Sequence, residues 1–175
     1  LDPPPLIISI LGDLIAAALN NNLLANELSP SLSLLEESIC KWFSTKIGFT
    51  ESAGGIAASG GTLSNLNALV AARYHAGLET DQNAVFLISE DAHSSFAKCS
   101  RIMGLGINNL IKVKTDNNGS MDIVDLKRTI EKCYKEGKKI FSIVATIGTT
   151  MRGAVDPIES ISRICKEKNI WLHID

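Results

Sequence analysis

The sequence predicts an α/β fold built on a largely parallel sheet with helices on both faces. From about residue 53 onward, short segments rich in Val and Ile alternate with longer segments of helical periodicity, which is the pattern of βαβ units. The segment IFSIVAT, at 140–146, is an almost unbroken apolar run, typical of a strand covered on both faces. With 175 residues, 45% of them apolar and 21% charged, the chain can form one such globular unit.

Two helices are predicted before this alternation begins. The stretch LIISILGDLIAAAL, at 6–19, has only 14 residues and contains Asp13. It is short for a membrane span, so we expect a buried helix. The stretch SLSLLEESICKWFSTKIG, at 31–48, predicts a second helix, in which Ser33 and Glu36 have the spacing of a capping box.

The chain is therefore expected to divide into an N-terminal helical segment, 1–52, and an α/β segment, 53–175. In the second segment, Asp156, Pro157 and Glu159 form a good helix start, with Asp as N-cap and Pro at the first helical position. Strands are expected at 85–89, 109–113, 140–146 and 170–174, and helices near 62–76, 93–103, 122–136 and 157–168.

The composition narrows the classes of partner. The formal net charge is −2 and the lysines are scattered, so nucleic acid has no basic track to follow. No basic leader precedes the first apolar stretch, and we expect a cytoplasmic protein that does not bind membranes. The four cysteines are widely spaced without a C-x-x-C pair, which argues against a metal site and a disulfide framework.

A glycine-rich turn that opens a helix raises the question of a bound anion, because the first N–H groups of a helix lack carbonyl partners. The turn GIAASGGT, at 55–62, imitates a nucleotide phosphate loop, but Gly61 stands where that loop needs lysine. A dinucleotide would need G-x-G-x-x-G, which is absent. A ligand with one phosphate remains, held by backbone N–H groups at Gly60 and Gly61 and the hydroxyls of Thr62 and Ser64. The alternative is a plain turn in which Thr62 only caps the helix.

Polar side chains follow three of the predicted strands. His93 comes after the first, Thr146, Thr149 and Thr150 end the third, and Asp175 follows the last. Open α/β sheets bind ligands at the carboxyl ends of their strands, so these groups are expected to converge. A ligand with one phosphate, a flat ring that a histidine could cover and a basic atom that a carboxylate could keep protonated is pyridoxal phosphate.

The sequence also resembles the group II pyridoxal-phosphate-dependent amino acid decarboxylases, which include aromatic amino acid, glutamate and diaminobutyrate decarboxylases. The resemblance covers nearly the whole chain, through LIISILGDLIAAALN, SPSLSLLEESICKWF, the glycine turn, SEDAHSSFAK, ATIGTTMRGAVDPI and WLHID. It implies the large domain of a fold-type I pyridoxal-phosphate-dependent transferase, present here in truncated form.

The same resemblance implies roles for individual residues. Gly60, Gly61 and Thr62 would hold the cofactor phosphate. His93 would lie over the pyridine ring and Thr150 near it, and Asp175 would bind the pyridinium nitrogen. His93 and Asp175 would be the catalytic residues. Apart from the resemblance, His75 lies late in a predicted helix and His173 inside a predicted strand, so both are expected to lie away from the chemistry.

The implied activity is decarboxylation of an L-amino acid to an amine and carbon dioxide by a homodimer. The family's Schiff-base lysine and small domain follow the aspartate motif, and no lysine here lies in such a motif. We therefore expect part of a longer protein, and residues 1–175 alone to be inactive. Two alternatives stay open: a non-catalytic binding or dimerisation module, and an enzyme of the same fold and cofactor that forms aldehydes or cleaves carbon–carbon bonds.

Overall fold

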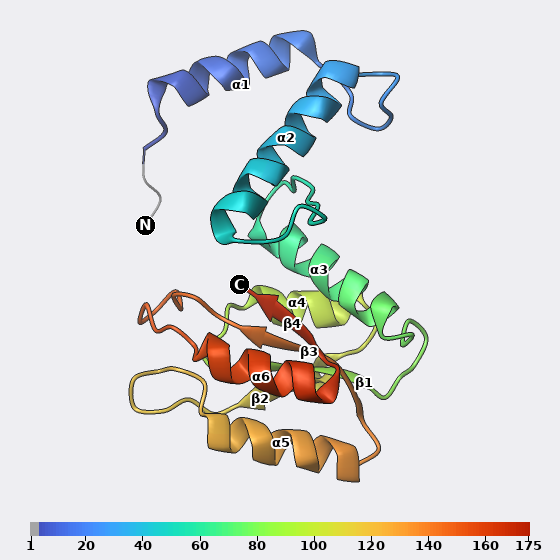
Figure 1. Cartoon of the computed structure of the whole chain (residues 1–175), viewed down its shortest axis with the longest axis vertical. Coiled ribbons are helices and arrows are strands. Elements are labelled where there is room, and N and C mark those ends of the chain that lie inside the picture. Colours follow the sequence, from blue (N-terminus) through green and yellow to red (C-terminus); the bar gives the residue numbers. More distant parts are fainter. Residues whose placement is uncertain (1–3) are drawn as a thin grey trace. The chain divides into compact units, whose positions relative to one another are not determined.

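The computed structural model describes residues 4–175. The chain separates into two compact units, Leu1–Ala57 and Ala58–Asp175, and each is described by itself. Unit 1 contains helices α1 (Ile7–Leu19) and α2 (Pro30–Ile47) (Figure 1).

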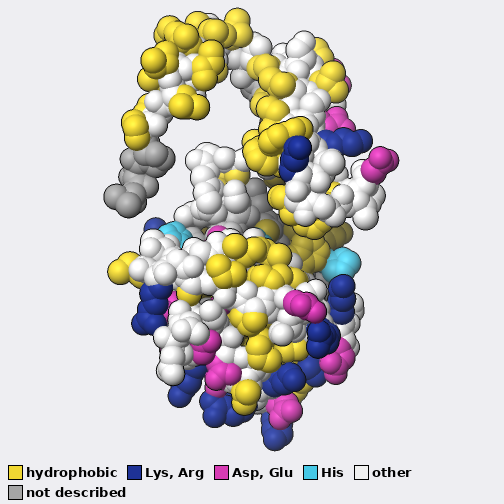
Figure 2. Space-filling view, turned by 60° about the vertical axis from the view of Figure 1, so that its left-hand side comes forward, with side chains coloured by type: hydrophobic (Ala, Val, Ile, Leu, Met, Phe, Trp, Pro, Cys, Tyr) yellow, Lys and Arg dark blue, Asp and Glu magenta, His cyan; other side chains and the backbone are white. Residues whose placement is uncertain are grey.

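Helix α1 forms where the sequence predicts it, but the expectation that it is buried is wrong. Every residue of α1 is exposed, including Ile8, Leu14 and Ile15 at 72%, 66% and 59%. Its Ile and Leu side chains gather on one half of the helix, with Ser9, Gly12 and Asp13 on the other, and among the described residues no other element covers them. Figure 2 shows them as an almost continuous apolar surface over this helix.

Helix α2 begins earlier than the predicted capping box. Ser29 is its N-cap and Pro30 occupies its first position, where the fixed φ of proline suits a helix and its missing N–H is not needed. Ser33 therefore lies inside the helix, and its hydroxyl donates to the Ser29 carbonyl at 3.0 Å. The Glu36 carboxylate accepts a hydrogen bond from the Ala57 N–H at 2.7 Å instead of closing a capping box.

Unit 2 is the predicted α/β fold. Its four-stranded sheet has the order β2-β1-β3-β4, and every neighbouring pair is parallel. The strands are β1 (Ala84–Ser89), β2 (Leu110–Val113), β3 (Lys139–Ala145) and β4 (Trp171–Ile174). The helices are α3 (Gly61–His75), α4 (Ser95–Ile102), the single-turn η1 (Ile107–Asn109), α5 (Ile123–Lys135) and α6 (Ile158–Lys168).

Helices cover both faces of this sheet because alternate strand residues point to opposite faces. Val85 and Leu87 of β1 belong to the core formed with α5 and α6, whereas Phe86 and Ile88 belong to the core formed with α3 and α4. All six residues of β1 are buried, as expected for a central strand covered on both sides. Figure 1 shows α5 and α6 together on one side of the sheet.

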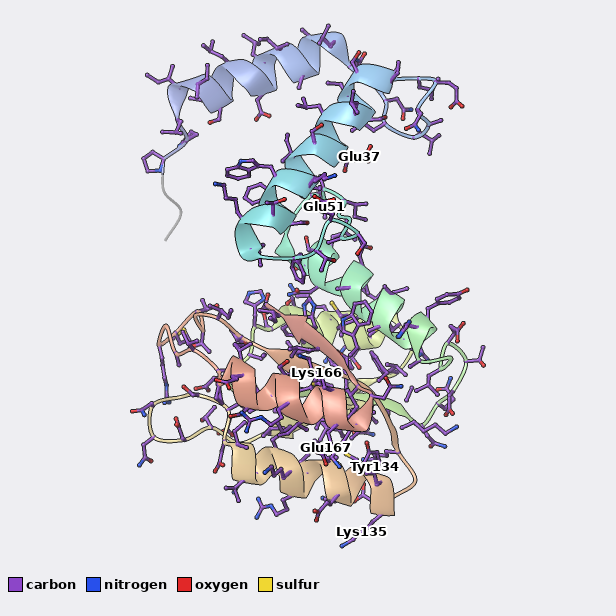
Figure 3. The ribbon with its side chains drawn as sticks, in the orientation of Figure 1. Glu37, Glu51, Tyr134, Lys135, Lys166 and Glu167 are labelled. Carbon is purple, nitrogen blue, oxygen red and sulfur yellow. The ribbon has the colours of Figure 1, made fainter. Side chains whose placement is uncertain are left out.

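The outer helices α5 and α6 carry mixed charges. Figure 3 labels Tyr134 and Lys135 on α5, and Lys166 and Glu167 on α6. The Lys168 ammonium lies 5.8 Å from the centre of the Tyr134 ring, so a cation–π contact joins the two helices. Because lysines and acidic side chains alternate there, this face offers no continuous basic surface.

Asp156 does not cap the helix that follows it, contrary to the prediction. Helix α6 begins at Ile158 with Pro157 as its N-cap, so the Asp156 side chain does not cap it. The carboxylate is instead 2% exposed and accepts hydrogen bonds from the Met121 and Thr146 N–H groups, each at 2.7 Å. The Met121 and Thr146 N–H groups lie outside the strands, and the carboxylate supplies the acceptor that each of them needs. Asp156 thereby joins the loop before α5 to the end of β3.

Two classes of feature are not found in residues 4–175. No helix there combines the length and the apolar character that a membrane span requires. Nor does this part of the chain bring together three His, Cys, Asp or Glu side chains that could hold a metal ion.

Candidate functional site

The carboxyl ends of the strands form one pocket. In the sheet order, β2 lies on one side of β1 and β3 on the other, and such a reversal opens a crevice between the loops after β1 and β3. A pocket of about 240 Å³ lies there, lined by His93, Thr146, Ile147, Gly148, Thr150 and Asp175. The structure therefore brings together four residues singled out from the sequence: His93, Thr146, Thr150 and Asp175.

The loop after β3 shapes one wall of the pocket. Gly148 adopts φ +89°, a left-handed conformation that favours glycine. Thr149 is turned away from the pocket, and its hydroxyl accepts the Ala154 N–H at 3.1 Å, which closes the loop on itself. The Thr146 hydroxyl is buried, and within residues 4–175 it has no hydrogen-bond partner.

The glycine turn is not among the residues that line this pocket. Gly60 is the N-cap of α3 without a side-chain cap, and Thr62 is the second helical residue, so Thr62 does not cap the helix. A side chain at Gly60 or Gly61 would meet no atom within 4 Å. The turn therefore leaves open space beside the first N–H groups of α3, where an anion could approach.

Asn65 connects the glycine-turn helix to the pocket. Its Nδ2 atom lies 3.1 Å from Asp175 Oδ1 and 3.2 Å from Ser95 Oγ. Its Oδ1 atom lies 2.9 Å from His173 Nε2. Ser95 in turn contacts His93, with 2.9 Å between Oγ and Nδ1. One helix that starts at the glycine turn thus reaches the side chains that follow β1 and β4.

Sequence reasoning missed Asn65 and its contact with His173. His173 does not line the pocket, as predicted, but it shares Asn65 with Asp175. An asparagine inside a helix carries no recognisable signal, because two of its three partners here are more than 100 residues away in sequence and the third is 30 residues away. His75 is exposed beside Trp171, with 5.7 Å between ring centres, and is outside the pocket lining.

Burial and charge oppose each other at His173. Burial lowers the pKa of the imidazole, and the nearby Asp175 carboxylate raises it less. The net pKa lies below the usual value of 6.5, so His173 is neutral at pH 7 and keeps one N–H to donate. Near His93, the Arg152 Nε atom lies 3.5 Å from Asp91 Oδ2, which places an ion pair between the loops after β1 and β3.

The chain is similar to known proteins in both sequence and fold. Residues 5–175 match the family model described as the pyridoxal-dependent decarboxylase conserved domain. The chain is 36% identical over 174 residues to the acidic amino acid decarboxylase of Xenopus tropicalis, covering 95% of this chain and 34% of that protein. It is 35% identical to human cysteine sulfinic acid decarboxylase, covering 95% of this chain and 35% of that protein.

A solved structure agrees with these relatives. The glutamate decarboxylase domain of a diaminobutyrate-pyruvate transaminase and L-2,4-diaminobutyrate decarboxylase from Vibrio parahaemolyticus superposes with a TM-score of 0.92 at 29% identity. The match covers 98% of this chain and 40% of that one. This chain spans about a third of the length of the two curated relatives. The match over residues 5–175 shows that the chain belongs to the pyridoxal-dependent decarboxylase family.

Proposed function

We propose that this chain forms part of the pyridoxal phosphate site of an amino acid decarboxylase. The observation that carries the proposal is the pocket at the carboxyl ends of the strands, where His93, Thr150 and Asp175 meet. Family membership supplies the cofactor class, and the pocket supplies groups that suit a ring with a basic atom. The whole protein would release carbon dioxide from the α-carboxylate of its substrate and leave an amine.

The residues present fit this cofactor. Asn65 binds Asp175 Oδ1, which leaves Oδ2 for a protonated ring nitrogen. Thr146 also lines the pocket, and its buried hydroxyl has no partner within residues 4–175, as expected where a ligand completes a site. The open space at Gly60 and Gly61 admits a phosphate to the start of α3.

Each residue has a distinct task in this proposal. The backbone N–H groups at Gly61 and Thr62 bind the phosphate, because a helix leaves its first N–H groups without carbonyl partners. His93 covers the ring, and Thr150 contacts its edge. The Asp175 carboxylate favours the protonated form of the ring nitrogen, since a nearby opposite charge raises the pKa of a cation. Bound pyridoxal phosphate acts as an electron sink for the carbanion left by the departing carboxylate.

The substrate is an amino acid, and acidic amino acids are the first to test. The curated relatives above are an acidic amino acid decarboxylase and a cysteine sulfinic acid decarboxylase. The test uses the protein expressed with its native flanking sequence, incubated with single amino acids in the presence and absence of pyridoxal phosphate. We expect cofactor-dependent carbon dioxide and the matching amine, while a folded protein inactive on every amino acid would contradict the proposal.

We also propose that the protein works as a homodimer in the cytoplasm. The exposed apolar side chains of α1, such as Ile7 at 79% and Ile8 at 72%, support the dimer. An apolar surface of this kind is commonly covered by a partner in a soluble protein.

A further inference from the structure

The hydrogen bonds around Asn65 have a definite direction. Asn65 is 6% exposed, and an amide oxygen accepts whereas an amide nitrogen donates. An ionised Asp175 carboxylate only accepts, so the Asn65 nitrogen must face it. The Asn65 oxygen then faces His173 Nε2, which must carry a proton and donate it. The opposite orientation of the amide would place two oxygens against each other.

Ser95 extends this network of hydrogen bonds to His93. The Ser95 N–H donates to His93 Nδ1 at 3.2 Å, so Nδ1 has a free lone pair and no proton. The Ser95 hydroxyl, 2.9 Å from the same nitrogen, therefore donates as well, and its oxygen accepts from Asn65. A neutral His93 then holds its single proton on Nε2.

These bonds use the whole hydrogen-bonding capacity of the Asn65 nitrogen. Its two hydrogens go to Asp175 Oδ1 and Ser95 Oγ, and both Ser95 and Asn65 are buried. The ends of the network, His93 and Asp175, are exposed, but turning the buried Asn65 amide or the buried Ser95 hydroxyl would leave a buried polar group without a partner. Asn67, by contrast, is exposed on the same helix.

We propose that Asn65 is a positioning residue of the pocket: it orients the Asp175 carboxylate and the Ser95 hydroxyl, which together with the Ser95 N–H keeps the His93 proton on Nε2. Asp175 then offers Oδ2 to the ring nitrogen of the cofactor, and His93 offers an N–H donor to an anionic group of a bound ligand. The part that concerns the cofactor rests on the proposed function, whereas the part that concerns the His93 proton does not.

The first experiment measures the histidine protons without cofactor. Protein with its native flanking sequence is labelled with ¹⁵N-histidine, and His93→Gln and His173→Gln assign the ring signals. We expect His93 to show an unprotonated Nδ1 and a protonated Nε2. In Asn65→Leu the Ser95 hydroxyl is free to turn away from Nδ1, so the two His93 signals move part of the way toward each other although the Ser95 N–H still faces Nδ1, while Asn67→Leu matches the wild type. A His93 protonated at Nδ1 in the wild type, or signals that do not change in a folded Asn65→Leu, would overturn the proposal.

The second experiment measures the ring nitrogen directly, with pyridoxal phosphate labelled with ¹⁵N in the ring. We expect the wild type and Asn67→Leu to bind it with a protonated ring nitrogen. Asn65→Leu shifts the signal toward the unprotonated form and weakens binding about tenfold, the effect of one charge-assisted hydrogen bond. Should that variant not fold, Asn65→Ala, which removes the donor to Asp175 without adding a charge or a larger side chain, is expected to show the same shift.

The outcomes separate the two claims. A wild-type protein that does not bind pyridoxal phosphate contradicts the proposed function, and the histidine signals still decide whether Asn65 positions its neighbours. A wild-type protein that binds it, with the same ring-nitrogen signal and affinity in a folded Asn65 variant, contradicts the role of Asn65 alone.

Discussion

Asp175 is the residue on which the proposed chemistry depends most. It directly follows β4, lines the pocket and has one carboxylate oxygen held by Asn65. A carboxylate that raises the ring-nitrogen pKa by a few units contributes about 1.4 kcal/mol per unit. Removing it therefore lowers the rate of any step that needs the protonated ring.

We expect Asp175→Ala, in the protein with its native flanking sequence, to lower kcat by roughly a hundredfold or more while circular dichroism stays unchanged. The matched control is Glu167→Ala, which removes an exposed carboxylate on α6 (Figure 3). Near-normal turnover by Asp175→Ala would show that this carboxylate does not serve the reaction.

Of the individual site residues, the sequence predicts those that follow the strands and does not predict Asn65. His93, Thr150 and Asp175 could be singled out because each follows an apolar run and carboxyl strand ends meet at one edge. Asn65 could not be found in this way, since the amide gains its partners only when α3 folds beside the ends of β1 and β4.

Among the elements, the strands and helices of unit 2 were predicted closely. The third strand, expected at 140–146, is β3 (Lys139–Ala145), because a long Ile/Val run between two helical patterns admits few other structures. The errors lie at helix starts. Pro30 is the first residue of α2, so the helix begins before the predicted capping box. The Asp156 carboxylate accepts hydrogen bonds from buried N–H groups, which no local sequence pattern reveals.

Asp156, which joins two loops, makes the free energy of unfolding depend on pH. Burial raises its pKa, and the hydrogen bonds from the Thr146 and Met121 N–H groups lower it by less. The folded state therefore holds this proton more tightly than the unfolded state, whose pKa is near 3.8. The stability contributed by this group is complete below the unfolded pKa and is lost as pH rises through the folded pKa.

We expect this loss in the difference between the free energies of unfolding of the wild type and Asp156→Asn. The free energy of unfolding of the wild type, relative to the variant, should fall as pH rises from about 3 through the raised pKa and then stay level to about pH 7. Urea unfolding across this range measures it. A difference that grows with pH would mean that the folded pKa is lowered.

For the whole molecule, the surface of unit 1 predicts association. Ile10 and Leu14, one helical turn apart on α1, are 53% and 66% exposed. In the protein with its native flanking sequence, we expect a dimer by light scattering. Ile10→Lys with Leu14→Lys should shift it toward monomer, whereas Asp13→Lys on the same helix should not. A monomeric wild type would contradict the homodimer.

Residues 1–175 alone are expected to release no carbon dioxide from any amino acid. None of the six residues that line the pocket is a lysine, and the Schiff-base lysine implied by the resemblance is not in this sequence. Radiolabelled carbon dioxide measured with and without the native flanking sequence tests this directly. Release from the isolated chain, free of contaminating enzyme, would contradict it.

The most direct test of the account is the absorption spectrum of the protein, with its native flanking sequence, titrated with pyridoxal phosphate. We predict a saturable cofactor band that borohydride abolishes and that is altered in Asp175→Ala. A folded protein that shows no such band would contradict the assignment of the pocket to pyridoxal phosphate.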